Sequence, residues 1–146
     1  MNESAKESII HLRKNSSTAY LASINGEDYP VMRAMLVLEH DSFHTHYFST
    51  NTSSRKVGYY QNNPKASVYY CEPDQYKGVL FVGDMEVCTD QETKDFLWRE
   101  GFECYYPLGA TDPDYCVLKF TANSGSFYHG LNSVTFAIEE FEDQEA

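Results

Sequence analysis

One stretch of this sequence decides how the chain is organised: Phe48-Ser49-Thr50-Asn51-Thr52-Ser53-Ser54-Arg55-Lys56-Val57. Its aromatic and β-branched start predicts the end of a strand, and its hydroxyl-rich middle predicts a turn. The residues from Thr52 to Asn62 then predict a helix, which Asn63-Pro64 ends because the residue before a proline avoids helical geometry. The stretch therefore joins a strand to a helix whose start carries two adjacent cations.

That helix start predicts a site for an anion. The first N–H groups of a helix lack partners within it, and the helix dipole is positive there. Ser54, Arg55 and Lys56 would add a hydroxyl and two charges, which suits a phosphate. From Ser42 to Cys71 there is no Asp or Glu in a chain of 22 acids, where random placement predicts roughly four or five. This window favours an anion site over an ordinary capped helix with solvated cations.

Arg33 is a second candidate for the same site. It stands mid-strand between Met32 and Ala34, in otherwise apolar surroundings. A lone arginine on a strand commonly faces solvent or pairs with an acid, and this alternative stays open. From the preceding strand, however, Arg33 could reach the anion held by Arg55 and Lys56, since converging cations are a common phosphate arrangement.

The rest of the pattern predicts short strands with flanking helices. Two further helices are expected at Glu3–Lys14 and, from a capping box at Thr89-Asp90-Gln91-Glu92, up to Glu100. Strands are expected at Thr18–Ile24, Pro30–Leu38, Ser42–Ser49, Ala66–Cys71, Gly78–Cys88, Tyr115–Thr121 and Ser126–His129. Asn25-Gly26 predicts a hairpin, and Gly83 predicts a bulge. Six or so strands in sequential antiparallel order make a mainly β protein, a small barrel with helices outside.

The length fits one domain over residues 1–146, with an N-terminal helical segment in residues 1–16 and a frayed acidic tail in residues 139–146. The net charge of −11 argues against nucleic acid or an anionic membrane surface as a partner. No apolar run approaches a membrane span, and the polar N-terminus does not suggest a signal peptide. We therefore expect a cytoplasmic protein.

Metal binding is not expected from the cysteines or histidines. The cysteines lack zinc spacing and are expected to be reduced, mostly buried thiols: Cys71, Cys88, Cys104 and Cys116. His44 and His46 would share a strand face, but no third ligand of matching type stands out. A polar outer strand face is the favoured interpretation of this pair.

Taken in order, several blocks of the sequence resemble the pyridoxamine 5′-phosphate oxidase-like family, the FMN-binding split barrel. The family pattern is an arginine strand, an aromatic strand end with Thr-Asn, a Ser-Arg-Lys helix start and an Asn-Pro stop. The matching blocks are Arg33-Ala34-Met35-Leu36, Tyr47-Phe48-Ser49-Thr50-Asn51, Ser54-Arg55-Lys56 and Asn62-Asn63-Pro64. Farther on, Val82-Gly83-Asp84-Met85-Glu86-Val87 resembles the family's central strand, and Asp112-Pro113-Asp114-Tyr115 resembles the general stress protein branch. The resemblance implies a six-stranded antiparallel split barrel.

The resemblance also implies a homodimer with FMN at the subunit interface and an FMN-dependent oxidoreductase with a small-molecule substrate or electron donor. The implied phosphate ligands are Arg55, Lys56, Ser54 and Thr50, beside Ser49 and Asn51, with Arg33 nearby. The backbone of Ala34, Met35 and Leu36 would line the flavin ring, and Tyr128 would approach it from the other subunit. No catalytic side chain is identified.

Two departures from the family pattern bear on activity. The oxidases themselves have a glutamine near the flavin where this chain has Gly78, and they carry C-terminal Arg and His residues for their substrate. This chain has no Arg after residue 99 and ends in acidic residues. Vitamin B6 oxidation is therefore not expected. The alternatives are a flavin-binding or storage protein without dedicated catalysis, and a split barrel that uses deazaflavin or haem.

Overall fold

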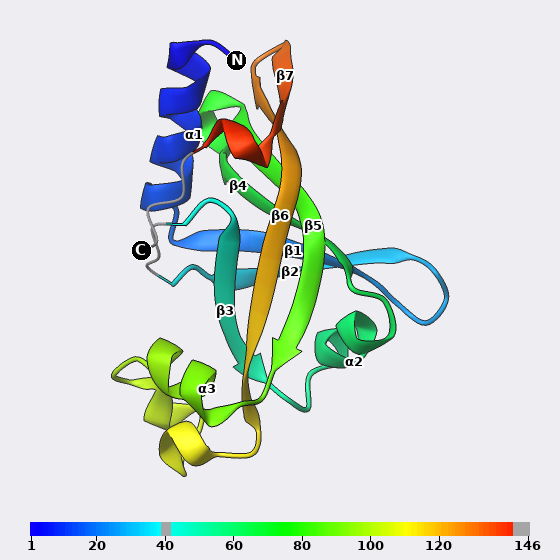
Figure 1. Ribbon diagram of the computed structural model, residues 1–146, viewed down its shortest axis with the longest axis vertical. Helices are drawn as coiled ribbons and strands as arrows, with labels where there is room; N and C mark the ends of the chain where they lie inside the picture. Colours follow the sequence, from blue (N-terminus) through cyan, green and yellow to red (C-terminus); the bar gives the residue numbers. More distant parts are fainter. Residues whose placement is uncertain (39–41, 142–146) are drawn as a thin grey trace.

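The computed structural model describes residues 1–38 and 42–141 as a strongly curled antiparallel sheet with three α-helices outside it (Figure 1). The helices are α1 Glu3–Asn15, α2 Arg55–Asn62 and α3 Gln91–Leu97, with short 3₁₀ turns η1 Pro73–Gln75, η2 Phe102–Cys104, η3 Gly109–Thr111 and η4 Ile138–Glu140. The strands are β1 Thr18–Ile24, β2 Pro30–Leu36, β3 Thr45–Asn51, β4 Lys65–Glu72, β5 Lys77–Cys88, β6 Tyr115–His129 and β7 Asn132–Ala137.

The sheet confirms the predicted split barrel, but the strand order is not sequential. Six strands follow the order β2-β1-β4-β5-β6-β3, and the short β7 pairs with β6 beside them. β1 therefore pairs with β4, and the whole of β3 pairs with the first half of β6. Local turn signals predict pairing between neighbours in the sequence, whereas these pairings join strands far apart in the chain and depend on burying one common core.

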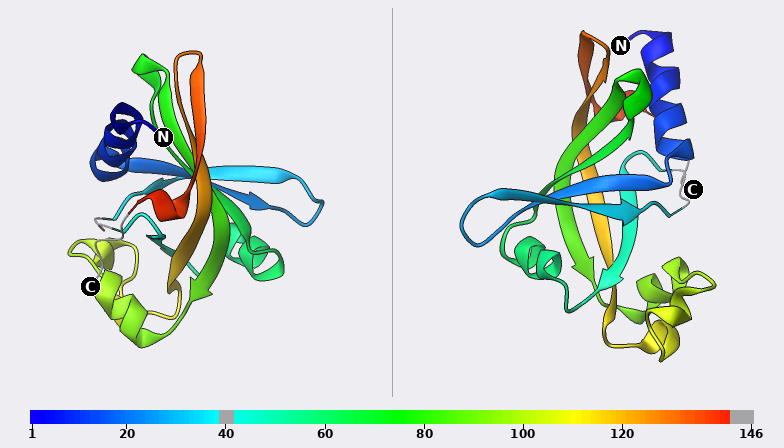
Figure 2. Two further views of the ribbon diagram at one scale, coloured as in Figure 1. Left: turned by 45° about the horizontal axis from the view of Figure 1, so that its top comes forward. Right: turned by 180° about the vertical axis from the view of Figure 1, so that it is seen from behind.

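The β1–β2 hairpin forms as predicted and extends far from the barrel (Figure 2). Asn25 organises its turn, because the side-chain Oδ1 accepts hydrogen bonds from the N–H groups of Glu27 and Tyr29, both at 3.0 Å. Asp28 adopts the left-handed conformation, with φ of 66°. The Asn-Gly signal thus placed the turn correctly, while Asp28, which tolerates this conformation well, supplies the positive φ.

β5 and β6 are the long strands of the barrel, and the predicted bulge lies between them. Their register shifts between Val82 and Gly83, so that Asn123 on β6 is the extra residue. A Cβ atom on Gly83 would collide with the backbone carbonyl of Thr121, which explains the glycine. Because the bulge absorbs the polar interruption, the two predicted strands at Tyr115–Thr121 and Ser126–His129 are one continuous strand.

Aromatic side chains fill the barrel, including Phe48, Tyr70, Phe81 and Phe120, and α1 closes one side with Ile9 and Leu12: all six belong to one core cluster. His46 lies fully buried among them, so the predicted polar outer face for this histidine is wrong. Side chains of β3 alternate between the core and the outer face, and the sequence analysis assigned His46 to the outer face although it lies on the core face. The imidazole is accommodated because both ring nitrogens find hydrogen-bond partners.

A second, smaller core lies under α3, η2 and η3, at the end of the barrel where β6 begins (Figure 1). Leu97, Tyr106, Tyr115 and Val117 are buried there. α3 begins one residue later than the capping box predicts, because Asp90 accepts the N–H of Thr93. It ends at Leu97 rather than Glu100, and residues 101–114 contain two 3₁₀ turns instead of an unbroken loop.

The C-terminal segment departs from the predicted frayed tail. β7 was not predicted, and Phe141 is buried against Phe43 and Phe136. The tail is therefore packed as far as Phe141, and its remaining residues, 142–146, lie outside the described structure. Cys88 and Cys116 are buried, Cys71 is half-buried and Cys104 is exposed. No described helix is long and apolar enough to cross a membrane.

Candidate functional site

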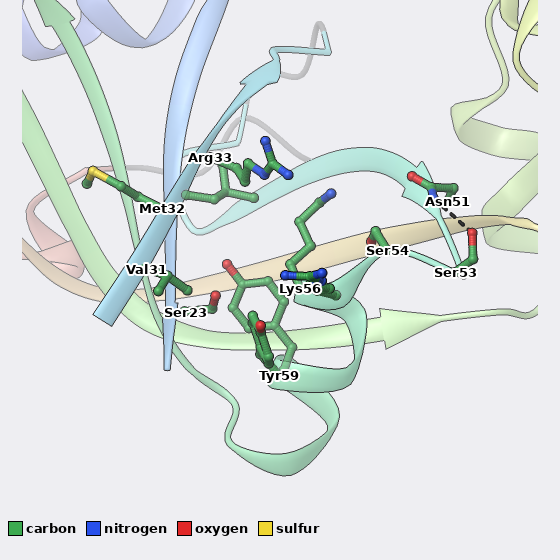
Figure 3. A pocket seen from close by; sticks show the side chains of 12 residues that line it. Ser23, Val31, Met32, Arg33, Asn51, Ser53, Ser54, Lys56 and Tyr59 are labelled. Atoms are coloured by element: carbon green, nitrogen blue, oxygen red, sulfur yellow. Dashed lines mark hydrogen bonds between the residues drawn. The ribbon is translucent and has the colours of Figure 1, made fainter. Parts of the chain in front are cut away.

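A cavity of about 700 Å³ lies where the start of α2 faces the β1–β2 hairpin (Figure 3). Its size suits a small organic ligand. It is lined by Leu21, Ser23, Val31, Met32, Arg33, Asn51, Ser53, Ser54, Arg55, Lys56, Tyr59 and Tyr60. Five of the predicted site residues line it, namely Arg33, Asn51, Ser54, Arg55 and Lys56.

The start of α2 presents its polar groups to this cavity. The helix begins at Arg55 rather than at the predicted Thr52, and Ser54 is its N-cap. An N-cap serine ordinarily accepts a hydrogen bond from a backbone N–H of the first turn. Here the Ser54 hydroxyl makes no such bond and is buried without a hydrogen-bond partner among the described residues. A hydroxyl and free N–H groups are thus both left for a ligand.

Arg33 on β2 faces the same cavity from the opposite wall. Residues on β2 alternate in direction, and Arg33 stands opposite Leu21 of β1, another lining residue. Its side chain extends toward that of Lys56 (Figure 3). Within residues 1–38 and 42–141, Arg33, Arg55 and Lys56 make no ion pair with a carboxylate. The described residues therefore do not show an arginine paired with an acid, but Arg33 is exposed to solvent as well as lining the cavity.

The cations in this cavity repel one another. Burial and the nearby Arg33 guanidinium lower the pKa of Lys56 below its ordinary value. Burial also raises the pKa of the Cys116 thiol, which keeps it neutral. Lys56 is half-buried, whereas Arg33 and Arg55 are exposed. Three cations beside one cavity without a described acidic partner leave a positive potential, which an anion would relieve.

Tyrosines from the second turn of α2 form the remaining wall, and the sequence analysis did not assign them to the site. Tyr59 and Tyr60 line the cavity, three and four residues after Lys56, which places all three on one helix face. The Tyr60 hydroxyl donates to the carbonyl of Ala22 at 2.9 Å and so ties α2 to β1. Helical spacing from Lys56 was the signal that could have found this wall.

The other predicted site residues lie elsewhere in this chain. Thr50 is buried in the barrel opposite Cys116, and Ser49 is its neighbour on β3. The strand residues Ala34, Met35 and Leu36 lie farther along β2. None of these five predicted site residues lines the described cavity.

Tyr128 lies on the outer face of the sheet, away from the cavity. Its ring stacks on Tyr69 with centroids 6.4 Å apart, and the two hydroxyls are hydrogen-bonded to each other. The Tyr69 ring covers Gly78, where a Cβ atom would collide with it. The space beside Gly78 is thus filled by a tyrosine from the neighbouring strand β4.

Comparison with known proteins identifies the family. A family model described as pyridoxamine 5′-phosphate oxidase like matches residues 4–142. This chain belongs to that family. A solved structure from Clostridium acetobutylicum, described as related to general stress protein 26 of B. subtilis and as of the pyridoxinephosphate oxidase family, is 36% identical. The match covers 96% of this chain and 99% of that one, with a TM-score of 0.87. The general stress protein resemblance is thereby confirmed.

More distant structures share the fold. A pyridoxamine 5′-phosphate oxidase-related, FMN binding protein from Nostoc punctiforme is 17% identical, with a TM-score of 0.69 over 91% of this chain and 87% of that one. A heme binding protein from Mycobacterium smegmatis is 14% identical, with a TM-score of 0.71 over 95% of this chain and 60% of that one. A search of curated proteins gives no match. At such identities the two structures support the fold alone.

Proposed function

We propose that this protein binds FMN in the described cavity, with the phosphate at the start of α2. The observation that carries the proposal is the convergence of Arg33, Arg55 and Lys56 on one cavity without a described acidic partner. Ser54 adds a buried hydroxyl that lacks a described partner, and α2 adds the positive end of its dipole. Family membership supports the same assignment, since FMN binding is typical of the family.

The cavity has a polar part and a less polar part, which suit the two ends of FMN. Arg33, Ser54, Arg55 and Lys56 would hold the phosphate. The aromatic and aliphatic wall would contact the less polar part, with Tyr59, Met32 and Val31 among the lining residues. When bound, FMN supplies hydride and single-electron chemistry. The chain itself would bind and orient the cofactor.

A flavin oxidoreductase of the general stress protein type is the activity we propose. Vitamin B6 oxidation is not expected, because Gly78 replaces the glutamine of the oxidases and Tyr69 occupies the space above it. Retention of a flavin spectrum after desalting, with FMN bound more tightly than riboflavin, tests the binding site. Reduction of the bound flavin by NADH or NADPH, with repeated turnover in the presence of an electron acceptor, tests the activity.

A flavin-binding protein without dedicated catalysis is the second candidate. Among the described residues that line the cavity there is no carboxylate, imidazole or thiol, so a proton donor near neutral pH is not evident there. The same composition disfavours haem, which usually takes a histidine or cysteine ligand. Bound flavin that resists both nicotinamide donors would favour this second candidate.

We also propose that two copies of the chain associate through the outer face of the sheet. Large uncharged side chains are exposed there on neighbouring strands, although the chain carries a net charge of −11. They are Tyr20, Met32, Leu36, Val82 and Tyr128. Contiguous exposed apolar surface of this kind marks an interaction site. Light scattering should give a dimer mass, and Leu36→Asp should shift it toward the monomer.

A further inference from the structure

The segment Asp112-Pro113-Asp114-Tyr115, which the function proposed above leaves unused, contacts the turn that leads into α2. The N–H of Thr52 donates to the carbonyl of Asp114 at 2.7 Å, and its hydroxyl donates to the carbonyl of Pro113 at 3.1 Å. The N–H of Ser53 donates to the carboxylate Oδ1 of Asp114 at 2.9 Å. Two backbone groups and one hydroxyl of the turn are therefore held from a segment 61 residues away.

The contacting segment is itself firmly anchored. Asp112 is buried, and its carboxylate accepts hydrogen bonds from the N–H groups of Asp114 at 3.0 Å and Leu108 at 3.2 Å. The carbonyl of Asp112 accepts a hydrogen bond from Lys94, whose ammonium also lies 5.5 Å from the ring centroid of Tyr115. The Tyr115 hydroxyl in turn donates to the carbonyl of Lys94 at 2.9 Å. A closed set of contacts thus connects α3 to the turn before Ser54.

These contacts also explain why α2 starts late. Thr52 and Ser53 have sequence features of a helix start, but their N–H groups are directed to Asp114 instead of along the helix axis. The first helical residue is therefore Arg55, with Ser54 as N-cap. Without Asp114 the turn could wind into helix, and the hydroxyl and N–H groups at the cavity would change direction.

We propose that Asp114 is a positioning residue for the anion site: through Ser53 it sets the direction of Ser54 and of the first turn of α2. This inference rests on the FMN site proposed above and adds a residue that does not line the cavity. The carboxylate is an acceptor here, so its hydrogen-bonding geometry matters rather than its charge. Its charge alone would disfavour a phosphate nearby.

Two substitutions of Asp114 separate geometry from charge. Asp114→Ala removes the acceptor and the charge, whereas Asp114→Asn keeps the Oδ1 acceptor and removes the charge. We expect Asp114→Ala to weaken FMN binding about tenfold, the scale of one well-placed hydrogen bond, with riboflavin binding unchanged because riboflavin lacks the phosphate. Asp114→Asn should bind FMN within about threefold of the wild type or more tightly. Thr52→Val, which removes the hydroxyl bond to Pro113, should give a smaller loss for FMN.

Asp114 is exposed, so these variants should fold, and the melting temperature without ligand verifies it. Glu103→Ala is the matched control, because this exposed carboxylate in η2 accepts a hydrogen bond from the N–H of Gly101 and does not contact the turn before α2. FMN affinity of Asp114→Ala equal to or above that of the wild type would overturn the proposal. So would an equal loss of FMN and riboflavin binding. If the wild type binds neither flavin, the proposed function itself fails, which is a separate result.

Discussion

Two regions of this molecule hold cationic or ionisable groups, and the groups differ in how far the chain itself provides their partners. Between α1 and the barrel, Arg13 is 3% exposed, donates to the carbonyl of Ser42 at 3.2 Å through its Nη2 and lies over the ring of Tyr70. Its Nε has no hydrogen-bond partner among the described residues. His46 is bonded through both ring nitrogens. At the cavity, Arg33 and Lys56 meet no described carboxylate, and burial with mutual repulsion lowers the pKa of Lys56.

The difference indicates which groups serve the fold and which serve a ligand. A buried polar group that the protein itself satisfies stabilises the folded state, and removing one partner leaves the other unsatisfied. Groups that the protein leaves unsatisfied reduce its stability and are retained where a ligand completes them. Substitutions in the barrel should therefore change stability, and substitutions at the cavity should change affinity.

The largest expected effect is that of His46→Ala on stability. The change removes a fully buried ring from between Tyr70, Phe81 and Phe120 and leaves the Tyr70 hydroxyl and the Phe43 carbonyl without this partner. We expect the free energy of unfolding to fall by about 3–5 kcal/mol in chemical denaturation. The exposed His129→Ala should change it by less than about 0.5 kcal/mol. A loss below about 1 kcal/mol for His46→Ala would remove this histidine from the stabilising core.

At the cavity, Arg55→Ala and Lys56→Ala should each weaken FMN binding by about 1.5–3 kcal/mol, the scale of a charge-assisted hydrogen bond. Stability without ligand should be unchanged or slightly higher, because each variant reduces the repulsion between cations. Calorimetry of FMN binding and thermal melts measure the two effects. Lys65→Ala is the control, since this exposed cation pairs with Asp84 at 3.7 Å outside the cavity. Unchanged FMN affinity in both cavity variants would refute the phosphate site.

Tyr70→Phe should lower the free energy of unfolding by about 1–2 kcal/mol, because the donor to His46 Nδ1 is lost. Burial raises the pKa of Tyr70 from 10.0 to about 12. Between those pH values the folded chain keeps a proton that the unfolded chain loses, so stability falls as pH rises. The variant should lose that part of the pH dependence, which denaturation at several alkaline pH values measures. An equal slope in both proteins would contradict the assignment, and the exposed Tyr76→Phe serves as control.

The smallest expected effect concerns pH and Lys56. Because its pKa is lowered, Lys56 loses its charge at a lower pH than an exposed lysine, and FMN binding should weaken as pH rises through that value. Stability without ligand should change in the opposite direction. The folded state disfavours the charged Lys56 amine, so its deprotonation as pH rises removes a destabilising charge. Lys56→Arg stays charged and should bind FMN with little alkaline weakening, within about threefold of the wild type at neutral pH. Parallel pH profiles for both proteins would rule out this role for Lys56.

Much of the local structure could be predicted from the sequence. The Asn-Pro stop of α2 was correct because it follows from backbone chemistry within a few residues. The bulge at Gly83 and the hairpin at Asn25 were correct for the same reason. Arg33 was placed near Arg55 and Lys56 through the family resemblance as well as its strand position, and the structure brings them to one cavity.

The failures involve contacts between distant parts of the chain. The face of His46, the pairing of β3 with β6 and the burial of Phe141 depend on which surfaces meet in the core. The late start of α2 depends on Asp114, far along the chain. Tyr59 and Tyr60 could have been recognised from their helical spacing with Lys56, but the presence of a cavity beside them could not.

The sequence by itself determined that this protein is a small β-rich chain with an acid-poor segment and a cation-bearing helix start. Those properties come from composition and from backbone preferences that act over a few residues. The tertiary structure decided that Arg33 faces that helix start, that Ser54 remains without a described partner, and that Asp114 holds the turn between them. These relations exist only when β2, α2 and the start of β6 are packed on one curled sheet, because each joins residues that the unfolded chain keeps far apart.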